Sequence, residues 1–584
     1  MKVSVCLGFL AAVAAAPFSL RAADEASLLG EVDAQALERH ARAIVMHRRD
    51  GGSPGENAAV DYVVETLRAD GIDVEVHVFP GYVSNPGRCV LRVEGAEPSE
   101  PTCLTQALAA STPQSGVSGE LVYVGGGTPS DYENVDVEGK VVLVNALPLP
   151  WGVKDAEDRG AVGAVFMSYS ELIQELTVSP IWGTPTHENY EELPSIPSVN
   201  INKPDGDALR EALASAPVTV AMETEVDTGW KMLKLAVATV ESEKDPDGFV
   251  LVGGHIDGWH YGAVDEGASN AAMVEMARIF HRHRGDLERS LKVAWWPAHS
   301  NGRYAGSAWY VDHAWLELRD HALAYLNIDG VGQMGASVYR SSNTASMDEL
   351  ASAVFREVAS VDGRGGRPGR NSDQGFYGVG MPLLQFSHGR VDPGGRYWFW
   401  HTTEDTFDKI DFGILAGDTK LYVAALSRLL TNAIPPIRLA AATKELTERL
   451  EERKGWAGNH FDLSSALAKA DELHRAAREL DRRLASYSGA STADVVRRMV
   501  RVIRPVLRVT YERNGPYHQD PALQVATIPG LAPLETLSEH PRGSDLYRFT
   551  QVHLVRERNR LEDSLDQAIR EARALSRALG DNAR

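Results

Sequence analysis

The chain has 584 residues, too many for one hydrophobic core, so several domains are expected. Its composition, 43% hydrophobic and 24% charged, is that of an ordinary globular protein. The formal net charge of -21 argues against nucleic acid or an anionic membrane surface as a partner, because both require a basic face.

Residues 1–23 are typical of a secretory signal peptide. Lys2 supplies a positive charge, the apolar run "VSVCLGFLAAVAAA" follows, and the small residues Ala22 and Ala23 suit cleavage. The run is short for a membrane span, and no other segment is long and apolar enough to be one. We therefore expect a secreted or periplasmic protein with no membrane span in the mature chain.

Two cysteines remain in the expected mature chain, Cys89 and Cys103. In an oxidising compartment they could form a disulfide across a short loop, and otherwise they are free thiols. The sequence leaves both alternatives open.

The first part of the mature chain is predicted to mix helix and strand. "NAAVDYVVETLRADGI" has apolar residues at helical spacing, and "DVEVHVF" alternates like a strand. From residue 115 to 228, short β-rich runs are separated by turn residues. The order of "GKVVLV" and "GAVGAVF" in this segment resembles the protease-associated (PA) domain. That resemblance implies an inserted β-rich module that shapes access to a neighbouring site.

Residues 229–435 alternate strand and helix. "FVLVGGHID" and "LKVAWWPA" read as buried strands, "NAAMVEMARIFHRH" as a helix, and "HALAYLNIDG" as a further strand. This alternation predicts the α/β class, with a mostly parallel sheet flanked by helices. Catalytic groups are then expected at the carboxyl ends of the strands. "GRGGRPGR" reads as a flexible loop.

Residues 436–584 are predicted to be helical. "LAKADELHRAARELDRRLA" and "LEDSLDQAIREARALSRAL" each place an apolar stripe on one helix face. Such stripes need a partner surface, which is either the chain's own helices or a second copy of the chain.

The segment "GGHIDGWHYGAVDEGASNAAMVEMA" carries the strongest chemical signal. His255 and Asp257 flank one residue at a strand end, so their side chains point the same way. Asp265 follows in a glycine-containing loop that precedes a helix. An imidazole with carboxylates is suited to zinc, and a second carboxylate can orient the imidazole. A structural hydrogen-bond network is the alternative explanation for this segment alone.

Further motifs follow in order along the chain. Asp329 ends the strand "AYLNIDG", "RNSDQGFYGVGMP" comes next, and His401 begins "HTTEDTFDKID". With "GGHID" and "GAVDEGAS", this ordered set resembles the M28 metallopeptidases, the family of zinc aminopeptidases and glutamate carboxypeptidase that includes the transferrin receptor. The resemblance implies a zinc-peptidase-like fold. It assigns 24–114 to the N-terminal part of the catalytic domain, 115–228 to the PA domain, 229–435 to the catalytic domain and 436–584 to a helical, dimerisation-like domain.

The resemblance also assigns roles to the matching residues. His255 and Asp329 would hold one zinc ion, and His401 would hold a second. Asp265 would bridge the two ions, and Asp257 would orient His255. The metal would polarise a substrate carbonyl and generate hydroxide at neutral pH.

The stretch "WWPAHSNGRYAGS" departs from the family pattern. Where the family has a general-base glutamate and a ligand glutamate, this chain has His299 and Ser300, with one residue apparently inserted nearby. Three outcomes follow. His299 ligates the second metal; or only the first metal binds and His299 is the general acid or base; or the site is inactive and binds a partner. The four retained ligands favour a bound metal, because clustered carboxylates repel one another without a cation.

Other residues near the motifs are candidates for catalysis or substrate binding. Glu266 beside Asp265, and Glu404 beside His401, could replace the missing base. Aromatic and arginine side chains flank the expected ligands and could bind an apolar group or a carboxylate of the substrate. The residues expected to bind substrate are Trp259, Tyr261, Tyr377, Arg390 and Trp400.

The sequence therefore predicts a secreted, metal-dependent hydrolase that cleaves an amide C–N bond of a small peptide or peptide-like substrate, with zinc as cofactor, one or two ions. His299 and Asp257 are its expected catalytic residues. Two alternatives stay open. One is an enzyme of this fold that acts on a non-peptide substrate, including by C–N elimination. The other is an inactive, receptor-like binding protein. A serine hydrolase is disfavoured, because no G-x-S-x-G elbow surrounds Ser300. A homodimer through the C-terminal helices is expected from the resemblance.

Overall fold

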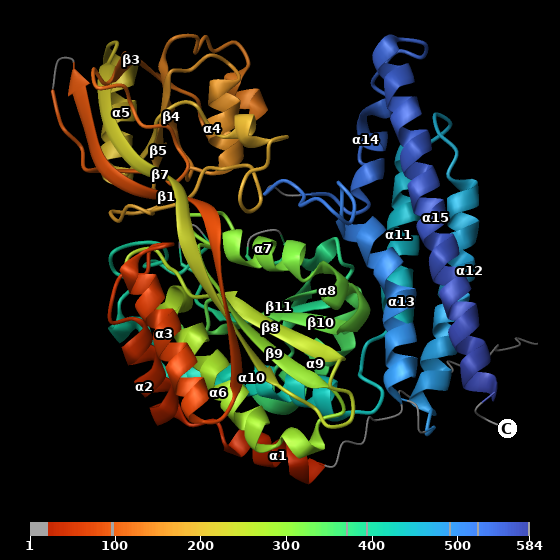
Figure 1. Ribbon diagram of the computed structural model, residues 1–584. Coiled ribbons are helices and arrows are strands. Elements are labelled where there is room, and N and C mark those ends of the chain that lie inside the picture. Colours follow the sequence, from red (N-terminus) through yellow and green to blue (C-terminus); the bar gives the residue numbers. More distant parts are fainter. Residues whose placement is uncertain are drawn as a thin grey trace, which may run out of the picture.

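The computed structural model describes residues 22–94, 98–369, 372–392, 395–489, 492–522 and 525–581. An α/β domain, a smaller β-rich domain and an elongated helical bundle lie beside one another (Figure 1). Most of the expected signal peptide, residues 1–21, lies outside the described residues.

The centre of the α/β domain is a sheet whose middle strands are parallel. They run in the order β13-β10-β8-β9, and side chains along β8 and β10 are buried throughout. Antiparallel strands flank this group, with β11 against β13 and β7 against β9. The bounds are β8 (Phe249–His255), β9 (Ser290–Trp296), β10 (Ala322–Asn327), β11 (Val338–Asn343), β12 (Arg364–Gly366) and β13 (Leu383–Gly389). β12 is parallel to β11 at the edge of the sheet, so "GRGGRPGR" contributes a short strand where a loop was expected.

Helices cover both faces of this sheet, which confirms the predicted fold class. α2, α3, α6 and α10 gather on one side, and α7 and α8 lie on the other (Figure 1). α1 and α9 pack against α10. The bounds are α1 (Ala22–Gly30), α2 (Ala34–Ile44), α3 (Pro54–Ala69), α6 (Ala268–Arg282), α7 (Ala305–His313), α8 (Trp315–His321), α9 (Asp348–Val354) and α10 (Phe412–Thr431).

Two long strands connect the α/β domain to the β-rich domain. β1 (Asp73–Glu94) and β7 (Thr219–Val240) pair antiparallel along nearly their whole length and run from one domain into the other (Figure 1). In the β-rich domain, β3, β4, β5 and β6 are parallel neighbours, and β2 pairs antiparallel with β6. The bounds are β2 (Cys103–Thr105), β3 (Val117–Tyr123), β4 (Val141–Val144), β5 (Gly163–Met167), β6 (Ser198–Ile201), α4 (Pro150–Glu157) and α5 (Lys203–Ser215). A disulfide joins Cys89 of β1 to Cys103 of β2.

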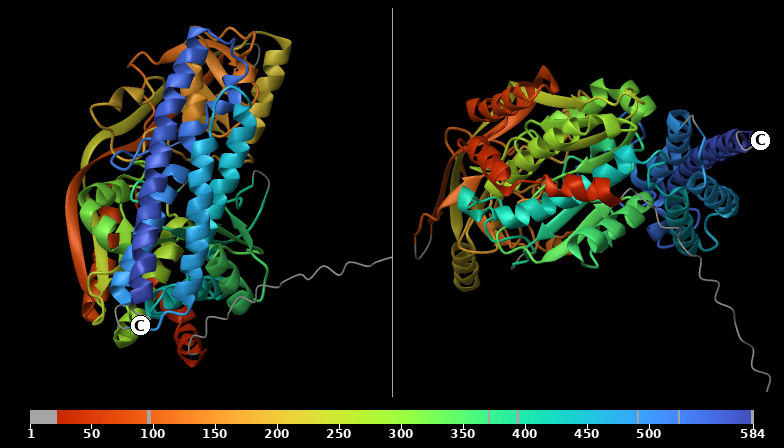
Figure 2. Two further views of the ribbon diagram at one scale, coloured as in Figure 1. Left: turned by 90° about the vertical axis from the view of Figure 1, so that its right-hand side faces the viewer. Right: turned by 90° about the horizontal axis from the view of Figure 1, so that it is seen from below.

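The C-terminal helices form a bundle along one side of the α/β domain (Figure 2). Its members are α11 (Leu439–Ala457), α12 (Ser464–Ala485), α13 (Thr492–Tyr511), α14 (Leu534–Leu537) and α15 (Asp545–Asp581). The predicted apolar stripes of α12 and α15 face other helices of the same chain, as in the buried pair Leu473 and Leu565. In the part of the chain that the structure describes, no helix combines the length and apolar character needed to cross a membrane.

Candidate metal centre

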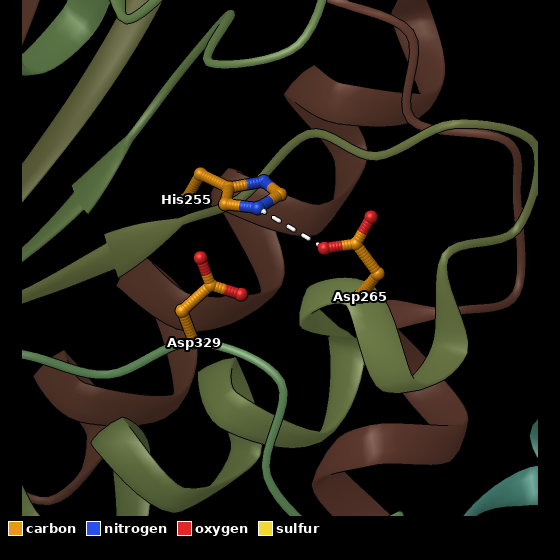
Figure 3. A group of neighbouring side chains, drawn as sticks. All are labelled: His255, Asp265 and Asp329. Atoms are coloured by element: carbon orange, nitrogen blue, oxygen red, sulfur yellow. Dashed lines mark ion pairs between the residues drawn. The ribbon is translucent and has the colours of Figure 1, made fainter. Parts of the chain in front are cut away.

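Three of the expected ligands meet at the carboxyl ends of neighbouring parallel strands. His255 is the last residue of β8, Asp329 follows β10, and Asp265 lies in the short π-helical turn (Ala263–Gly267) directly before α6. One ligand atom from each lies within 4.8 Å of the others, and the side chains point toward one another (Figure 3). The sheet topology explains this convergence, because adjacent parallel strands end at the same edge.

His401 reaches the same cluster from the opposite side of Asp265. Its Nε2 atom lies 3.0 Å from Oδ2 of Asp265, while Oδ1 of Asp265 lies 3.5 Å from Nε2 of His255. Each carboxylate oxygen thus faces one imidazole. This is the arrangement that a carboxylate bridging two metal ions requires.

Both imidazoles are held in the orientation that a metal ligand needs. Nδ1 of His255 lies 3.0 Å from the carbonyl oxygen of Asp257, and Nδ1 of His401 lies 2.9 Å from that of Glu175. With Nδ1–H donating to a carbonyl, the Nε2 lone pair is left facing Asp265. In the protein without metal, burial lowers the pKa of His255. The Asp257 and Asp265 carboxylates outweigh this effect and hold the pKa well above its usual value.

Both carboxylate oxygens of Glu266, beside these ligands, have no hydrogen-bond partner among the described residues. Glu266 is fully buried, and burial together with Asp329 raises the pKa of its carboxyl group well above the usual value. Unpaired buried carboxylates are costly, and a divalent cation removes that cost. The nitrogen and oxygen donors suit zinc.

Asp257 supports the stretch "WWPAHSNGRYAGS", which departs from the family pattern. Its two carboxylate oxygens accept hydrogen bonds from the backbone N–H groups of His299 and Ser300, both at 2.8 Å. One of these oxygens is also 3.5 Å from Nδ1 of His255. Asp257 therefore links the predicted ligand His255 to the loop that carries His299.

His299 projects into the cavity with its imidazole fixed on three sides. Its Nδ1 atom is 2.7 Å from Oδ2 of Asp373, and its ring stacks on that of His255 with centroids 3.8 Å apart. Tyr304 meets the ring edge-on at 4.7 Å. Asp373 is fully buried and also accepts a hydrogen bond from the Ser307 hydroxyl. Asp373 belongs to "RNSDQGFYGVGMP", but no local pattern in the sequence pairs it with His299.

The other candidate replacements for the glutamate pair differ in position. Ser300 is buried and lines the cavity, and its hydroxyl has no hydrogen-bond partner among the described residues. Oε1 of Glu266 lies 3.9 Å from Nε2 of His255, within the ligand cluster. Glu404 is exposed and is not among the described residues that line the cavity.

A cavity of about 660 Å³ opens onto the cluster. Trp259 and Trp400 line it, as expected of substrate-binding residues, and the Trp400 ring stacks on His401 with centroids 3.7 Å apart. The other three residues expected to bind substrate lie elsewhere and are absent from the described lining.

Local packing accounts for those three positions. The Tyr377 hydroxyl is buried and donates to the carbonyl oxygen of Gly369. Arg390 pairs with Asp392 at 2.6 Å. The Tyr261 side chain is 44% exposed, while its carbonyl oxygen accepts a hydrogen bond from Arg49.

The cavity contains basic residues. Arg396, in the loop before His401, was a candidate for binding a substrate carboxylate and lies among the lining residues. Arg303, Arg340 and Arg364 also line the cavity and were not expected there. Arg340 and Arg364 are paired neighbours on β11 and β12. A protein with a net charge of -21 thus carries a positively charged group of side chains around this cavity. Arg364 reaches the cavity through the pairing of β12 with β11. Local sequence patterns did not predict this pairing.

Residues far apart in the sequence hold the ligand loops in place. The buried guanidinium of Arg49 donates to the carbonyl oxygens of Ile256, Tyr261 and Gly262. Arg49 thereby fixes the loop between His255 and Asp265.

Asp405 supports the same loop from the segment after His401. Its carboxylate oxygens accept from the N–H groups of Val264 and Asp265 at 2.9 and 3.0 Å. Burial and the neighbouring Asp265 carboxylate raise the pKa of Asp405 to about 7.

The fold and the site define a class of protein: an α/β zinc-peptidase-like domain with a His/Asp/Asp cluster near the carboxyl ends of its parallel strands, in which His255 and Asp265 are buried and Asp329 is partly buried. Residues 236–424 match peptidase family M28, and residues 117–209 match the PA domain. The chain therefore carries an M28-family peptidase domain with an inserted PA domain, which confirms the resemblance seen in the sequence.

Curated proteins have similar sequences. The "Probable glutamate carboxypeptidase VP8" of Zea mays is 22% identical over 525 residues, covering 75% of this chain and 72% of the relative. The "Probable lipoprotein aminopeptidase LpqL" of Mycobacterium tuberculosis is 29% identical over 318 residues, covering 52% of this chain and 60% of the relative. The "Probable glutamate carboxypeptidase LAMP1" of Arabidopsis thaliana is 24% identical over 343 residues, covering 51% of this chain and 49% of the relative.

Solved structures have the same fold. The aminopeptidase from Aneurinibacillus sp. strain AM-1 superposes with a TM-score of 0.56 at 23% identity, covering 70% of this chain and 96% of that one. BSAP, a zinc aminopeptidase from Bacillus subtilis, gives 0.54 at 20% identity, covering 69% and 95%. At these identities the likeness establishes the fold alone.

Proposed function

We propose that this protein is a metal-dependent hydrolase that cleaves the amide C–N bond of a peptide or peptide-like compound, with His299 in place of the family's glutamate base. The observation that carries the proposal is the His299–Asp373 pair, 2.7 Å apart, beside the buried ligand cluster in the same cavity. His299 itself lines that cavity, so its imidazole is accessible to a molecule bound there.

The residues present fit a zinc site. His255, Asp265 and Asp329 would hold one ion, and Asp265 and His401 would contribute to a second. When bound, zinc would supply Lewis acidity toward the substrate carbonyl and lower the pKa of a water molecule. Ser300 offers only a neutral hydroxyl to the second position, so we infer a tighter first site and a weaker second one.

His299 is suited to moving protons in this cavity. Donation from Nδ1–H to Asp373 leaves the Nε2 lone pair free to accept a proton from the attacking water. The protonated imidazole then passes that proton to the departing amine nitrogen. The Asp373 carboxylate fixes the ring orientation and stabilises the imidazolium while it exists. The alternative is that His299 is a ligand of the second metal ion. In that role His299 would bind the ion through the same Nε2 atom.

The cavity wall supports a substrate that carries a carboxylate group. Arg340, Arg364 and Arg396 can bind a carboxylate through their forked donors, and the Trp259 and Trp400 rings offer apolar surface. We therefore propose an acidic peptide or an N-acyl amino acid as the substrate class. A non-peptide amide with a carboxylate, or its cleavage by C–N elimination, would use the same surface.

Secretion or export to the periplasm is part of this proposal. The disulfide between Cys89 and Cys103 supports an oxidising compartment. We further propose a homodimer through the helical bundle. Its support is an exposed apolar stripe on α15, formed by Leu546, Phe549, Val552 and Val555.

The proposal is tested by metal content and substrate turnover together. The purified protein is analysed for zinc and screened with aminoacyl and N-acyl amides, with and without a chelator. We expect at least one zinc ion per chain and chelator-sensitive turnover of an acidic substrate, which His299→Ala abolishes while zinc is retained. Absence of zinc, or turnover that survives both chelation and His299→Ala, would contradict the proposal. Zinc binding without any turnover would instead support the receptor-like alternative.

A further inference from the structure

A loop of the PA domain contacts a ligand of the proposed metal site. Residues 174–178, called here the insert loop, lie between β5 and β6 of the PA domain. The N–H group of Glu175 donates to the carbonyl oxygen of His401 at 2.9 Å, and Nδ1 of His401 donates to the carbonyl oxygen of Glu175 at 2.9 Å. Two hydrogen bonds in opposite directions therefore join these residues. Leu176 and Thr177 of the same loop line the cavity.

The side chain of Glu175 adds a third connection to the α/β domain. It is 5% exposed, and its Oε2 atom lies 3.1 Å from Nε2 of His260, in the loop between His255 and Asp265. The insert loop thus touches both segments that supply ligands to the second metal position.

The insert loop is in turn fixed to the core of the PA domain. Leu176 donates its N–H to Oε1 of the fully buried Gln106 at 2.7 Å, and its carbonyl oxygen accepts from the N–H of Ala107 at 3.0 Å. Asn200, on β6, donates to the carbonyl oxygen of Gln174 at 2.8 Å. These contacts connect the interior of the PA domain to His401 through one short segment.

His401 needs this support. Its backbone adopts a left-handed conformation with φ of 57°, which non-glycine residues adopt at a cost of roughly 1 kcal/mol. Its ring is stacked on Trp400, and the Glu175 carbonyl decides which ring nitrogen carries the hydrogen. The outer partner of a ligating histidine commonly changes metal affinity about 10–100-fold.

We propose that the insert loop is a positioning element of the second metal site, so that docking of the PA domain and metal binding at His401 are thermodynamically coupled. This inference rests on the proposed function, because it takes His401 as a ligand. Coupling is reciprocal, so metal binding must also stabilise the docked loop. The PA domain then sets the occupancy of the metal site as well as the shape of the cavity.

The test compares two amide side chains of the same domain. Gln106→Ala removes the acceptor of the Leu176 N–H, whereas Asn202→Ala removes the side-chain cap of α5 and none of the insert-loop hydrogen bonds given above. Zinc binding to the full chain is measured by calorimetry, and hydrogen exchange of the Glu175 amide is followed with and without zinc. We expect Gln106→Ala to weaken the second zinc by about tenfold or more, to leave the first unchanged, and to remove zinc-dependent protection of the Glu175 amide. Asn202→Ala should change neither.

Either of two results would overturn the inference. One is that wild type and Gln106→Ala bind zinc with equal affinities. The other is that both variants lose zinc affinity to the same extent at both zinc positions. If the wild-type protein binds no zinc, the proposed function fails. The positioning of His401 by the insert loop is then tested by a second measurement that does not require zinc. Nuclear magnetic resonance of protein labelled with 15N-histidine reports which ring nitrogen of His401 carries the hydrogen. An Nδ1–H form that is present in wild type and Asn202→Ala but lost in Gln106→Ala supports positioning, and an unchanged form refutes it.

Discussion

Oδ2 of Asp373 lies 2.7 Å from Nδ1 of His299, and the two residues come from segments more than 70 positions apart. The carboxylate is fully buried and its other oxygen accepts from Ser307, so its position is fixed. The pair gives the cavity a carboxylate-supported imidazole at the place where the family resemblance puts a carboxylate base. Under the proposed function, the general base is therefore an imidazole at this position, next to the proposed metal ligands.

Substitution of His299 should separate catalysis from metal binding. His299→Ala removes the proton acceptor and is expected to lower kcat by about 10²–10⁴-fold, the usual contribution of a general base. Asp373→Asn keeps the shape but loses the charge that stabilises the imidazolium, so we expect a smaller fall, with KM little changed. Steady-state kinetics and zinc analysis on each variant provide the measurement. If His299→Ala instead loses zinc, the residue is a ligand and not the base.

The second metal position should respond to a restored carboxylate. Ser300→Glu places an anionic donor beside Asp265 and His401, and we expect the weaker zinc to bind at least about tenfold more tightly. Ser300→Ala is the matched control and should leave both affinities unchanged, because a neutral hydroxyl contributes little. Competition titration with a zinc indicator measures the two steps. An identical effect of the two substitutions would show that Ser300 does not face the metal position.

The arginines of the cavity predict a preference for anionic substrates. Arg340→Gln and Arg364→Gln should each raise KM for a carboxylate-bearing amide by about 10-fold, with a smaller effect on its neutral analogue. Arg390→Gln is the control, since Arg390 pairs with Asp392 and is absent from the described lining. The comparison uses kcat/KM for the charged and neutral substrates at two salt concentrations. Equal changes for the two substrates would argue against carboxylate recognition.

The alternation of strands and helices predicted the parallel sheet, and the family resemblance implied that His255, Asp265 and Asp329 lie together at one site. Neither predicted Asp373, Arg364 or the insert loop. Each of these reaches the site because segments that are distant in the sequence pair with one another. Such pairing produces no local periodicity in the sequence from which it could be predicted. Tyr377 and Arg390, expected to bind substrate, are not among the described residues that line the cavity. Proximity to a motif in sequence suggested a substrate contact, whereas local packing directs both side chains elsewhere.

The exposed stripe on α15 predicts self-association. Phe549 is 69% exposed beside Leu546 and Val552, and burying such side chains favours association by roughly 1.5–3 kcal/mol each. Phe549→Glu should therefore shift the protein toward a monomer in light scattering coupled to size exclusion. Gln567→Glu, on an exposed part of the same helix, should not. A wild-type protein that is monomeric at micromolar concentration would refute the proposed dimer.

His40 predicts a pH dependence of stability that is independent of the metal ligands. This buried residue of α2 contacts Tyr62 through Nδ1 at 2.8 Å and Arg278 through Nε2 at 3.3 Å. Burial, reinforced by Arg278 and Arg39, lowers its pKa from 6.5 to about 4. Between these values the unfolded chain binds a proton that the folded chain does not. Stability is therefore lost as pH falls from 6.5 to 4 and is unaffected above that window.

His40→Gln keeps a polar side chain of similar reach but does not titrate. The loss of unfolding free energy between pH 7 and 4.5 should thus be smaller in the variant, by about 2 kcal/mol after allowance for partial solvent screening. Urea unfolding with a chelator present throughout isolates this difference from metal release. Parallel pH profiles for the two proteins would mean that His40 is protonated in the folded state, and that the Arg278 contact is not maintained in solution.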